Sequence, residues 1–255
     1  MKKLLSLIRV ELDRIIRDWK LYAGMVGFLI MCFIVKKDHS TSGALDGINV
    51  MLITSNTVFL LVIFAALPGS CIFCDDWEEG FYKFIINRSS PGKYIVSKVA
   101  VCIICTFLVS FLSFCVFGLA EYMINGSGSE GFYPGAVLYN LVNSNMNILY
   151  IFIRAALLSL VICVYSQFGL ACSAIFPNRF VSIASPLISA IIINELSDNY
   201  RINNVSLHAI MAAGKIFNEG IPVYLSAAGI LIGLSLVADL IFAWSVKRRI
   251  QCEIN

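Results

Sequence analysis

Six runs of apolar residues, each close to the length of a membrane-crossing helix, constrain this chain more than any other feature of its sequence. They lie at about 20–36, 50–73, 97–122, 148–175, 181–196 and 222–245. A hydrocarbon core of about 30 Å needs roughly 20 helical residues, because each residue of an α-helix advances the chain by about 1.5 Å. The sequence therefore predicts six transmembrane helices.

Composition supports the same fold class. Of 255 residues, 59% are hydrophobic and 14% are charged, and the mean hydropathy is +0.84. A single water-soluble core does not hold this many apolar side chains, since soluble domains are roughly half apolar and one quarter charged. We expect an all-α membrane protein with one transmembrane domain, 1–255. The net charge of +3 does not indicate a nucleic-acid partner.

The segment before the first run, 1–19, has the pattern of an amphipathic helix. Its charged residues occupy the faces left by apolar residues that recur at spacings of three and four. Such a helix lies in the membrane interface, and packing on a soluble partner is the alternative. Charges from Arg9 to Arg14 interrupt the segment too early for a signal peptide, so we expect no cleavage. The apolar residues are Leu4, Leu5, Ile8, Leu12, Ile15, Ile16 and Trp19.

Lysine and arginine are distributed unevenly between the two sides that six spans define. Fourteen lie on the side of the two termini and four lie on the opposite side. The positive-inside rule therefore predicts that both termini are cytoplasmic, with the chain in the plasma membrane. The cytoplasmic loops are then 74–96 and 176–180. The outer loops are 37–49, a loop at 123–147 that is Gly-rich over 125–136, and 197–221, whose partial periodicity is compatible with a short amphipathic or re-entrant helix.

The loop 74–96 carries the most informative residues. It begins with an acidic run, Asp75–Glu79, which we interpret as a helix N-terminus. Trp77, Phe81 and Phe84 follow at spacings of four and three, which places them on one helical face. Three aromatic residues on a cytoplasmic loop predict an exposed ridge that binds a partner. The alternative is an interfacial helix that rests on lipid headgroups.

In this loop the chain resembles the membrane subunit of an ATP-binding-cassette exporter of the second class, a family of six-span permeases. The family has an acidic residue and a glycine after the second span, then an apolar patch, a Ser/Pro turn and a basic residue that opens the third span. Glu79-Gly80, Phe84–Ile86, Arg88–Pro91 and Lys98 stand in those places. The chain departs from the pattern at Phe81, where the family commonly has a small hydroxyl residue.

The resemblance implies that a short coupling helix within 74–96 fits a cleft of a separate cytoplasmic ATPase and transmits its movement to the second and third spans. It implies a second, smaller contact at the turn Pro177–Phe180, for which a plain tight turn is the alternative. It also implies export of an antimicrobial peptide, a drug or another amphiphile. The residues expected at the ATPase contacts are Trp77, Glu78, Glu79, Gly80, Phe81, Tyr82, Phe84, Arg88 and Arg179.

No ATP-binding motif occurs in the sequence. The phosphate-binding motif Gly-x-x-x-x-Gly-Lys-Ser/Thr is not met by Gly92-Lys93, which Tyr94 follows, or by Gly214-Lys215, which Ile216 follows. We therefore expect no enzymatic activity and no cofactor in this chain, with ATP and Mg²⁺ bound by the partner ATPase. Since six helices are few to enclose a large cargo, a second copy or a sister permease is expected as a further partner.

Polar residues inside the apolar runs are candidates for the translocation path. Arg154 and Glu195 lie at similar depths in the fourth and fifth runs. An unpaired charge at the bilayer centre costs at least about 2.5 kcal/mol, so we hypothesise an ion pair between them, with snorkelling of Arg154 as the alternative. The other candidates, for which interhelical hydrogen bonding is the alternative role, are Ser55, Asn56, Thr57 and Gln167.

Most cysteines of the chain lie in its apolar runs. Eight of the nine cysteines, all but Cys252, fall within or beside apolar runs and are interpreted as small buried hydrophobes. The Cys71/Cys74 and Cys102/Cys105 spacings match zinc thiolates, but ionising thiols in hydrocarbon is unfavourable, so we expect packing and no metal.

An intramembrane protease is disfavoured because both histidines lie in predicted outer loops. A passive channel or secondary carrier stays open as an alternative.

Overall fold

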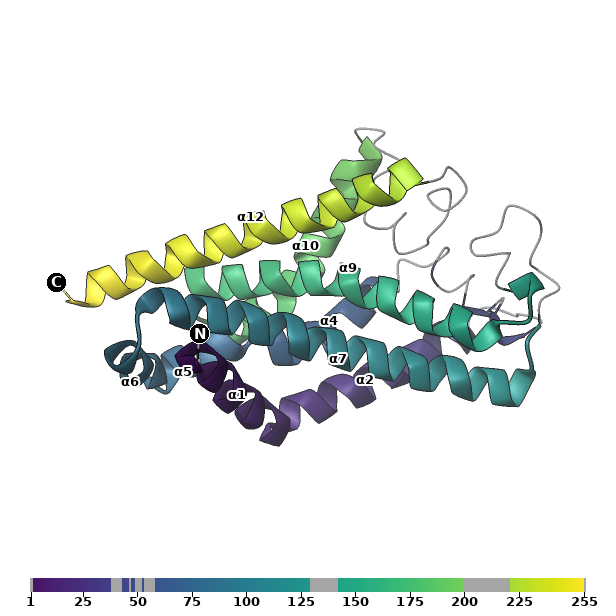
Figure 1. Ribbon diagram of the computed structural model, residues 1–255, viewed down its shortest axis with the longest axis horizontal. Helices are drawn as coiled ribbons and strands as arrows, with labels where there is room; N and C mark the ends of the chain where they lie inside the picture. The colour runs from purple at the N-terminus through teal and green to yellow at the C-terminus, as the bar shows by residue number, and fades with distance from the viewer. Residues whose placement is uncertain are drawn as a thin grey trace.

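The computed structural model describes residues 2–37, 43–45, 47–48, 52, 58–128, 142–199 and 221–254, and all regular structure within these ranges is helical (Figure 1). This confirms the predicted all-α fold class. The helices are α1 (Lys2–Arg17), α2 (Trp19–Lys37), α4 (Val58–Ser70), α5 (Ile72–Glu78), α6 (Phe81–Arg88), α7 (Pro91–Asn125), α9 (Asn147–Ile175), α10 (Arg179–Asn199) and α12 (Ile221–Ile254).

Several helices have the length and composition needed to cross a bilayer. Among the described residues, α2, α7, α9, α10 and α12 each contain a sufficiently long apolar stretch. A sixth span results if α4 and α5, which meet at an angle of 44°, are taken as one bent helix. The helices therefore have the character of a multi-pass membrane protein. α7 has 35 residues, about 52 Å at 1.5 Å per residue, so it is longer than the hydrocarbon core.

The bend between α4 and α5 has a cause in the sequence. Pro68 lies inside α4 and has no backbone N–H, so the carbonyl of Phe64 lacks its intrahelical donor, and the Gly69-Ser70 pair that follows stands directly before the break at Cys71. The same carbonyl is closely approached by α2 at Gly24, where an added Cβ would lie 2.7 Å from the Phe64 oxygen. The glycine thus allows α2 and α4 to pack at short range.

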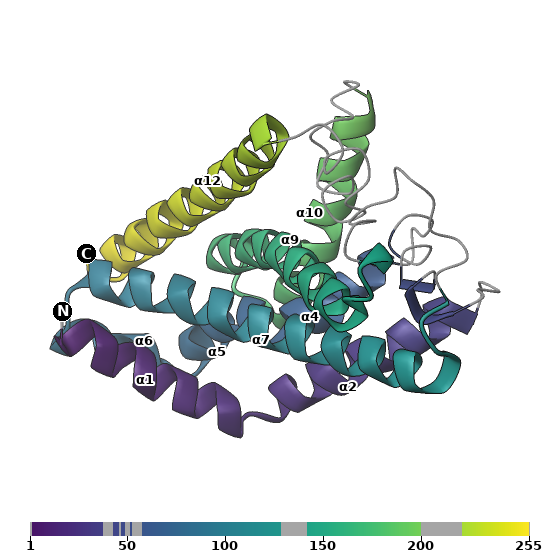
Figure 2. The same cartoon turned by 45° about the vertical axis from the view of Figure 1, so that its right-hand side comes forward.

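α9 is the central helix of the bundle. It packs against α4, α7, α10 and α12 (Figure 2), and every side chain of residues 161–167 in its middle part is buried. Small polar side chains join it to its neighbours: Ser166 of α9 lies 2.9 Å from Thr106 Oγ1 and 3.2 Å from Cys102 Sγ, both on α7. Gly69 of α4 fits against this group, since its Cβ would lie 2.5 Å from Thr106 Oγ1. Interhelical hydrogen bonds and a close backbone approach therefore hold the centre.

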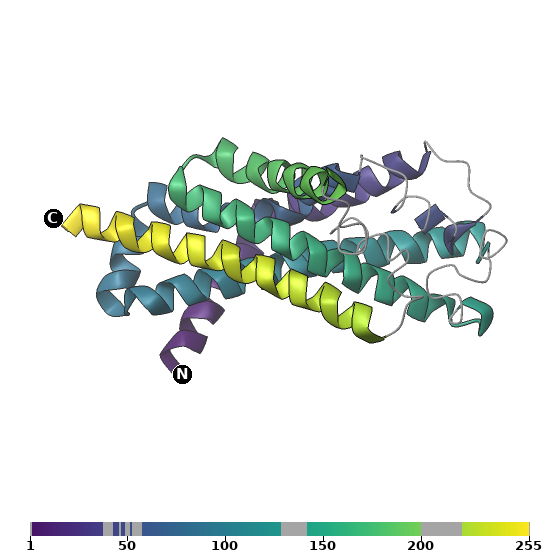
Figure 3. The same cartoon turned by 90° about the horizontal axis from the view of Figure 1, so that it is seen from above.

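The two chain termini lie at the same end of the bundle, as an even number of spans predicts (Figures 1 and 3). α5, α6 and the connection between α9 and α10 lie there too. We call this end the termini end. The predicted outer loop 197–221 is described only at its two ends, where α10 continues to Asn199 and α12 begins at Ile221, and the predicted short helix within it falls on residues 200–220, outside the described residues. Residues 38–42, 49–51 and 129–141 lie outside them too.

Candidate functional site

Asp76 of α5 and Lys98 of α7 form the centre of a buried ionic cluster at the termini end. Their charged atoms lie 2.5 Å apart, and neither side chain is exposed. Lys98 Nζ also lies 2.6 Å from Glu11 Oε2 of α1. Asp76 accepts hydrogen bonds from Arg14 Nη1 at 2.5 Å and from the Tyr94 hydroxyl at 3.0 Å. Two carboxylates and two cations therefore neutralise one another inside the protein.

A second layer of ion pairs surrounds this centre. Arg14 Nη2 donates to Glu79 Oε2 at 2.6 Å, and Lys20 of α2 pairs with Asp75. Arg179, the first residue of α10, lies 2.6 Å from Glu78 Oε2. Four acidic residues on and beside α5 are thus joined to α1, α2, α7 and α10. We refer to the whole group as the ionic cluster, and its members are Glu11, Arg14, Lys20, Asp75, Asp76, Glu78, Glu79, Lys98 and Arg179.

Arg14 stays charged in this setting. Partial burial lowers the pKa of its guanidinium, but attraction to Asp76, Glu79 and Glu11 and the hydrogen bond to Asp76 outweigh the burial, so the pKa is raised. The arginine also lies over the ring of Phe81, with its central carbon 5.1 Å from the ring centroid. Arg14 therefore connects the ionic cluster to α6 as well as to α5.

The acidic run has a different role from the one expected. Asp76 and Glu78 lie in the last turn of α5, which ends at Glu78, and only Asp75 reaches the first turn, so the interpretation of the whole run as a helix N-terminus is wrong. The helix ends because Gly80 adopts a left-handed conformation with φ of 68°, a region that glycine enters without steric cost. α6 then starts at Phe81 in a new direction.

This break also changes the predicted aromatic ridge. Trp77 belongs to α5 and stacks inward between Phe73, at a centroid distance of 5.9 Å, and Tyr82, at 4.5 Å. Tyr82 itself is buried. A continuous exposed ridge of Trp77, Phe81 and Phe84 is therefore a wrong prediction, because the left-handed residue between α5 and α6 turns the two helices apart. The Trp77–Tyr82 stack instead locks α6 onto α5.

The exposed side chains in the described part of α6 are Phe81, Lys83 and Phe84, of which two are aromatic. Phe84 is 68% exposed and Phe81 is 37% exposed. With Ile85 and the apolar residues of α1 around Leu7, they line a shallow hollow of about 280 Å³. The side chain of Arg88 lies outside the described part of the chain. An apolar surface rimmed by charges at one end of a membrane bundle is typical of a protein-binding site.

The second predicted contact meets the first. Arg179 follows the turn that starts at Pro177, and its guanidinium pairs with Glu78. The loop 74–96 and the turn Pro177–Phe180 therefore adjoin each other at the termini end and form one surface.

The intramembrane candidates do not assemble into a charged pair. Arg154 is buried and lies over the Tyr150 ring at 5.9 Å, whereas Glu195 is exposed on α10. No ion pair joins these two described residues, because Arg154 points into the bundle and Glu195 away from it. Gln167 is buried in α9, and its Oε1 has no hydrogen-bond partner in the described part of the chain. Ser55, Asn56 and Thr57 lie outside the described residues.

The cysteines pack as apolar side chains. Seven of the nine are buried, Cys172 is half-buried and Cys252 is exposed, and all are free thiols. In the ranges that the structure describes, no group of three His, Cys, Asp or Glu residues has the arrangement of a metal site.

Sequence reasoning missed the buried members of the ionic cluster. Glu11 and Asp76 lie in segments that carry several other charges, and only Lys98 stands alone in a stretch of apolar residues. A charge in such a position requires a partner when it is buried, and this signal identifies Lys98 as a candidate for the cluster without identifying which residues pair with it.

Comparison with family models, with curated proteins and with solved structures finds no match to this chain.

Proposed function

We propose that this chain is the membrane subunit of an ATP-driven exporter, and that a separate cytoplasmic ATPase acts on it through α5 and α6. The proposal rests on two features that lie next to each other at the termini end. α6 presents exposed aromatic residues, and α5, which precedes it directly, is ion-paired to α1, α2, α7 and α10. A partner bound to α6 would therefore act on most of the helices at once.

Few contacts separate α6 from the long helices that an ATPase would move. Movement of α6 passes to α5 through the stack of Tyr82 on Trp77. From α5 it passes to α7 through Asp76 and Lys98, and to α10 through Glu78 and Arg179. The Asp76–Lys98 pair is fully buried and separates only at high cost, so α5 and α7 move together, whereas the Glu78–Arg179 pair is exposed and makes a weaker link to α10. Rigid-body tilting of packed elements is an established way of converting binding at one site into opening at another.

The predicted contact residues divide into three groups under this proposal. Phe84, Phe81 and Glu79 lie at the surface, where they meet the ATPase, and Gly80 sets the direction of α6. Trp77 and Tyr82 act inside the chain by fixing α6 to α5. Glu78 and Arg179 connect α5 to α10.

The remaining parts of the proposal follow from the same assignment. Both termini are cytoplasmic and the chain resides in the plasma membrane, consistent with the excess of lysine and arginine on the termini side. ATP and Mg²⁺ bind to the partner chain. Two copies of this chain, or this chain and a sister permease, enclose the path. The cargo is an amphiphile such as an antimicrobial peptide or a drug, since the spans carry few charges.

Copurification and ATP hydrolysis test the proposal together. The full chain is extracted in mild detergent, and the retained proteins are examined for one with a Gly-x-x-x-x-Gly-Lys-Ser/Thr motif and for ATPase activity. Phe84→Ala should lower both by about tenfold, equivalent to roughly 1.4 kcal/mol of binding free energy. Trp19→Ala is the matched control, because Trp19 is an exposed aromatic residue in α2 outside α6.

Two outcomes contradict the proposal. One is retention of the ATPase at undiminished level by the double variant Phe81→Ala/Phe84→Ala. The other is a wild-type chain that retains no such protein and yet transports solute in purified form, which favours a channel or secondary carrier.

A further inference from the structure

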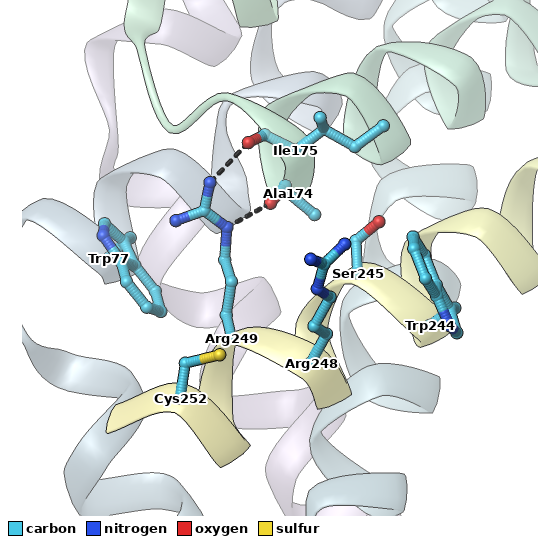
Figure 4. A pocket seen from close by; sticks show the side chains of 8 residues that line it. All are labelled: Trp77, Ala174, Ile175, Trp244, Ser245, Arg248, Arg249 and Cys252. Atoms are coloured by element: carbon cyan, nitrogen blue, oxygen red, sulfur yellow. Dashed lines mark hydrogen bonds between the residues drawn. The ribbon is translucent and has the colours of Figure 1, made fainter. Parts of the chain in front are cut away.

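A second hollow at the termini end lies between α5, the last turn of α9 and the last turns of α12 (Figure 4). It has a volume of about 340 Å³, and it is distinct from the apolar hollow beside α6. Two tryptophans, Trp77 and Trp244, lie on opposite sides of it, and the guanidinium groups of Arg248 and Arg249 lie between them. None of the lining residues whose side chains the structure describes is acidic.

Arg249 is held in place by the end of α9. Its Nε donates to the carbonyl of Ala174 at 2.5 Å, and its Nη2 donates to the carbonyl of Ile175. Its guanidinium also lies 5.2 Å from the centroid of the Trp77 ring. The positive charge therefore stays inside the hollow, fixed by a helix C-terminus whose free carbonyls favour cations.

Arg248 supplies a second charge of a different kind. Its guanidinium stacks on Trp244 with 5.5 Å between the central carbon and the ring centroid, and no carboxylate in the described ranges pairs with it. Stacking orients the planar guanidinium without using its N–H donors. Two arginines with donors available, and with no acidic side chain among the described residues that line the hollow, form a site that is complementary to a phosphate group.

The surface beside the hollow is suited to acyl chains. Trp244 is 63% exposed, and the residues that precede it on the same face of α12, at spacings of three to four, are exposed as well: Leu240, Leu236, Val237 and Ile232. Tryptophan and arginine at the end of an apolar strip mark the headgroup level of a bilayer. The hollow and the strip together therefore match one molecule that has an anionic head and apolar tails.

We infer that this hollow binds the phosphate of an anionic phospholipid, with its acyl chains along the exposed face of α12. Arg248 and Arg249 hold the phosphate, and Trp244 covers the junction between headgroup and chains. The inference needs only that the chain spans a bilayer, so it does not depend on the ATPase partner or on which side the termini face. The bound lipid adds contacts between α12 and the rest of the bundle. Without lipid, α12 packs mainly on α9 and to a smaller extent on α7.

Lipid titration of the purified full chain tests the inference. The chain in neutral detergent is titrated with phosphatidylglycerol or phosphatidylcholine, and bound lipid is counted by native mass spectrometry. Phosphatidylglycerol should bind at least fivefold more tightly than phosphatidylcholine. Arg248→Gln should weaken phosphatidylglycerol binding at least fivefold, and Trp244→Ala should weaken it as well. Lys247→Gln is the matched control, since Lys247 is an adjacent cation on α12 outside the hollow, and it should change the affinity less than twofold.

Three results overturn the inference. Equal weakening by Lys247→Gln and Arg248→Gln shows diffuse attraction to a basic surface. Unchanged binding by Arg248→Gln shows that the lipid sits elsewhere. Competition by inorganic phosphate at the same concentration as the lipid, with no effect of Trp244→Ala, shows a site for free phosphate. Thermal unfolding without lipid identifies a variant that misfolds, and Arg248→Lys, which keeps the charge and loses the fork, then replaces Arg248→Gln with an expected intermediate affinity.

Discussion

Lys98 of α7 and Glu11 of α1 form an ion pair with 2.6 Å between Nζ and Oε2, and their side chains are 0% and 3% exposed. The same ammonium lies 2.5 Å from Asp76 of α5. A single buried charge therefore fixes the position of the N-terminal helix against both α5 and α7. The amphipathic segment at the N-terminus is thus bound to the bundle on its inner face, while Leu5, Ile16 and Trp19 remain exposed on another face.

Removal of this ammonium should be among the most destabilising single changes in the chain. Lys98→Met leaves Glu11 buried and takes one of two cations from Asp76, and breaking a buried pair in this way costs roughly 3–5 kcal/mol. The measurement is thermal unfolding in detergent, followed by circular dichroism. Lys93→Met, at an exposed position of the same helix, should change the stability by less than about 0.5 kcal/mol.

A double-mutant cycle then isolates the pair itself. Glu11→Gln/Lys98→Met should be less destabilised than the sum of the two single variants, because the double variant buries no orphaned carboxylate at position 11. Additive effects within about 0.3 kcal/mol would show that the two residues are not coupled.

Trp77→Ala and Phe84→Ala should separate folding from partner binding. Trp77 loses its stacks with Phe73 and Tyr82, and truncation of a packed aromatic residue costs roughly 3–5 kcal/mol. Phe84 is exposed on α6, so its truncation should change stability by less than about 0.5 kcal/mol. Unfolding of the two purified variants measures the difference. Equal stability of both variants would refute the internal position of Trp77.

Gly24→Ala and Gly233→Ala should have opposite effects on stability. A Cβ at Gly24 would lie 2.7 Å from the backbone oxygen of Phe64, whereas a Cβ at Gly233 meets no atom within 4 Å. Forcing α2 from α4 costs about 1–3 kcal/mol, while alanine replaces glycine in an open helical position with a gain of up to about 1 kcal/mol. Thermal unfolding of both variants decides the matter, and a destabilised Gly233→Ala would contradict it.

Cys252 provides a direct measurement of orientation. It is the one cysteine of the nine that is exposed, and seven of the others are buried. With cytoplasmic termini, a membrane-impermeant maleimide should label the native chain in inside-out vesicles and leave it unlabelled in intact cells. Cys252→Ser should abolish the labelling in vesicles. Labelling of Cys252 in intact cells would place the termini outside and remove the basis for the ATPase contact.

The positions of the membrane-length helices followed from hydropathy alone. α2, α9 and α10 begin and end within a few residues of the predicted runs at 20–36, 148–175 and 181–196. This agreement has a simple cause, because an apolar run of membrane length has few alternatives to a helix in lipid. α7 begins earlier than the predicted 97, at Pro91, since its first turns are packed on protein and need no apolar pattern.

The pairing of charges was not available from the sequence. Arg14 and Asp76 are 62 positions apart, and a linear pattern shows which residues are charged without showing which of them meet. The rule that residues four positions apart share a helical face misplaced Trp77 for a related reason. A spacing of four suggests one face only while the helix continues, and the left-handed Gly80 ends it. The Arg154–Glu195 hypothesis used depth alone, although partners must also point toward each other.

The attachment of α1 to residues of α5 and α7 has a consequence for the order of events during synthesis. The partners of Glu11 and Arg14 leave the ribosome long after α1 does, and translation adds only about 5–20 residues per second. For several seconds α1 therefore remains at the bilayer surface, where the Glu11 carboxylate is hydrated. Its final docking, which dehydrates Glu11, therefore belongs to a late stage of biogenesis, after the hairpin of α5 and α7 has been made.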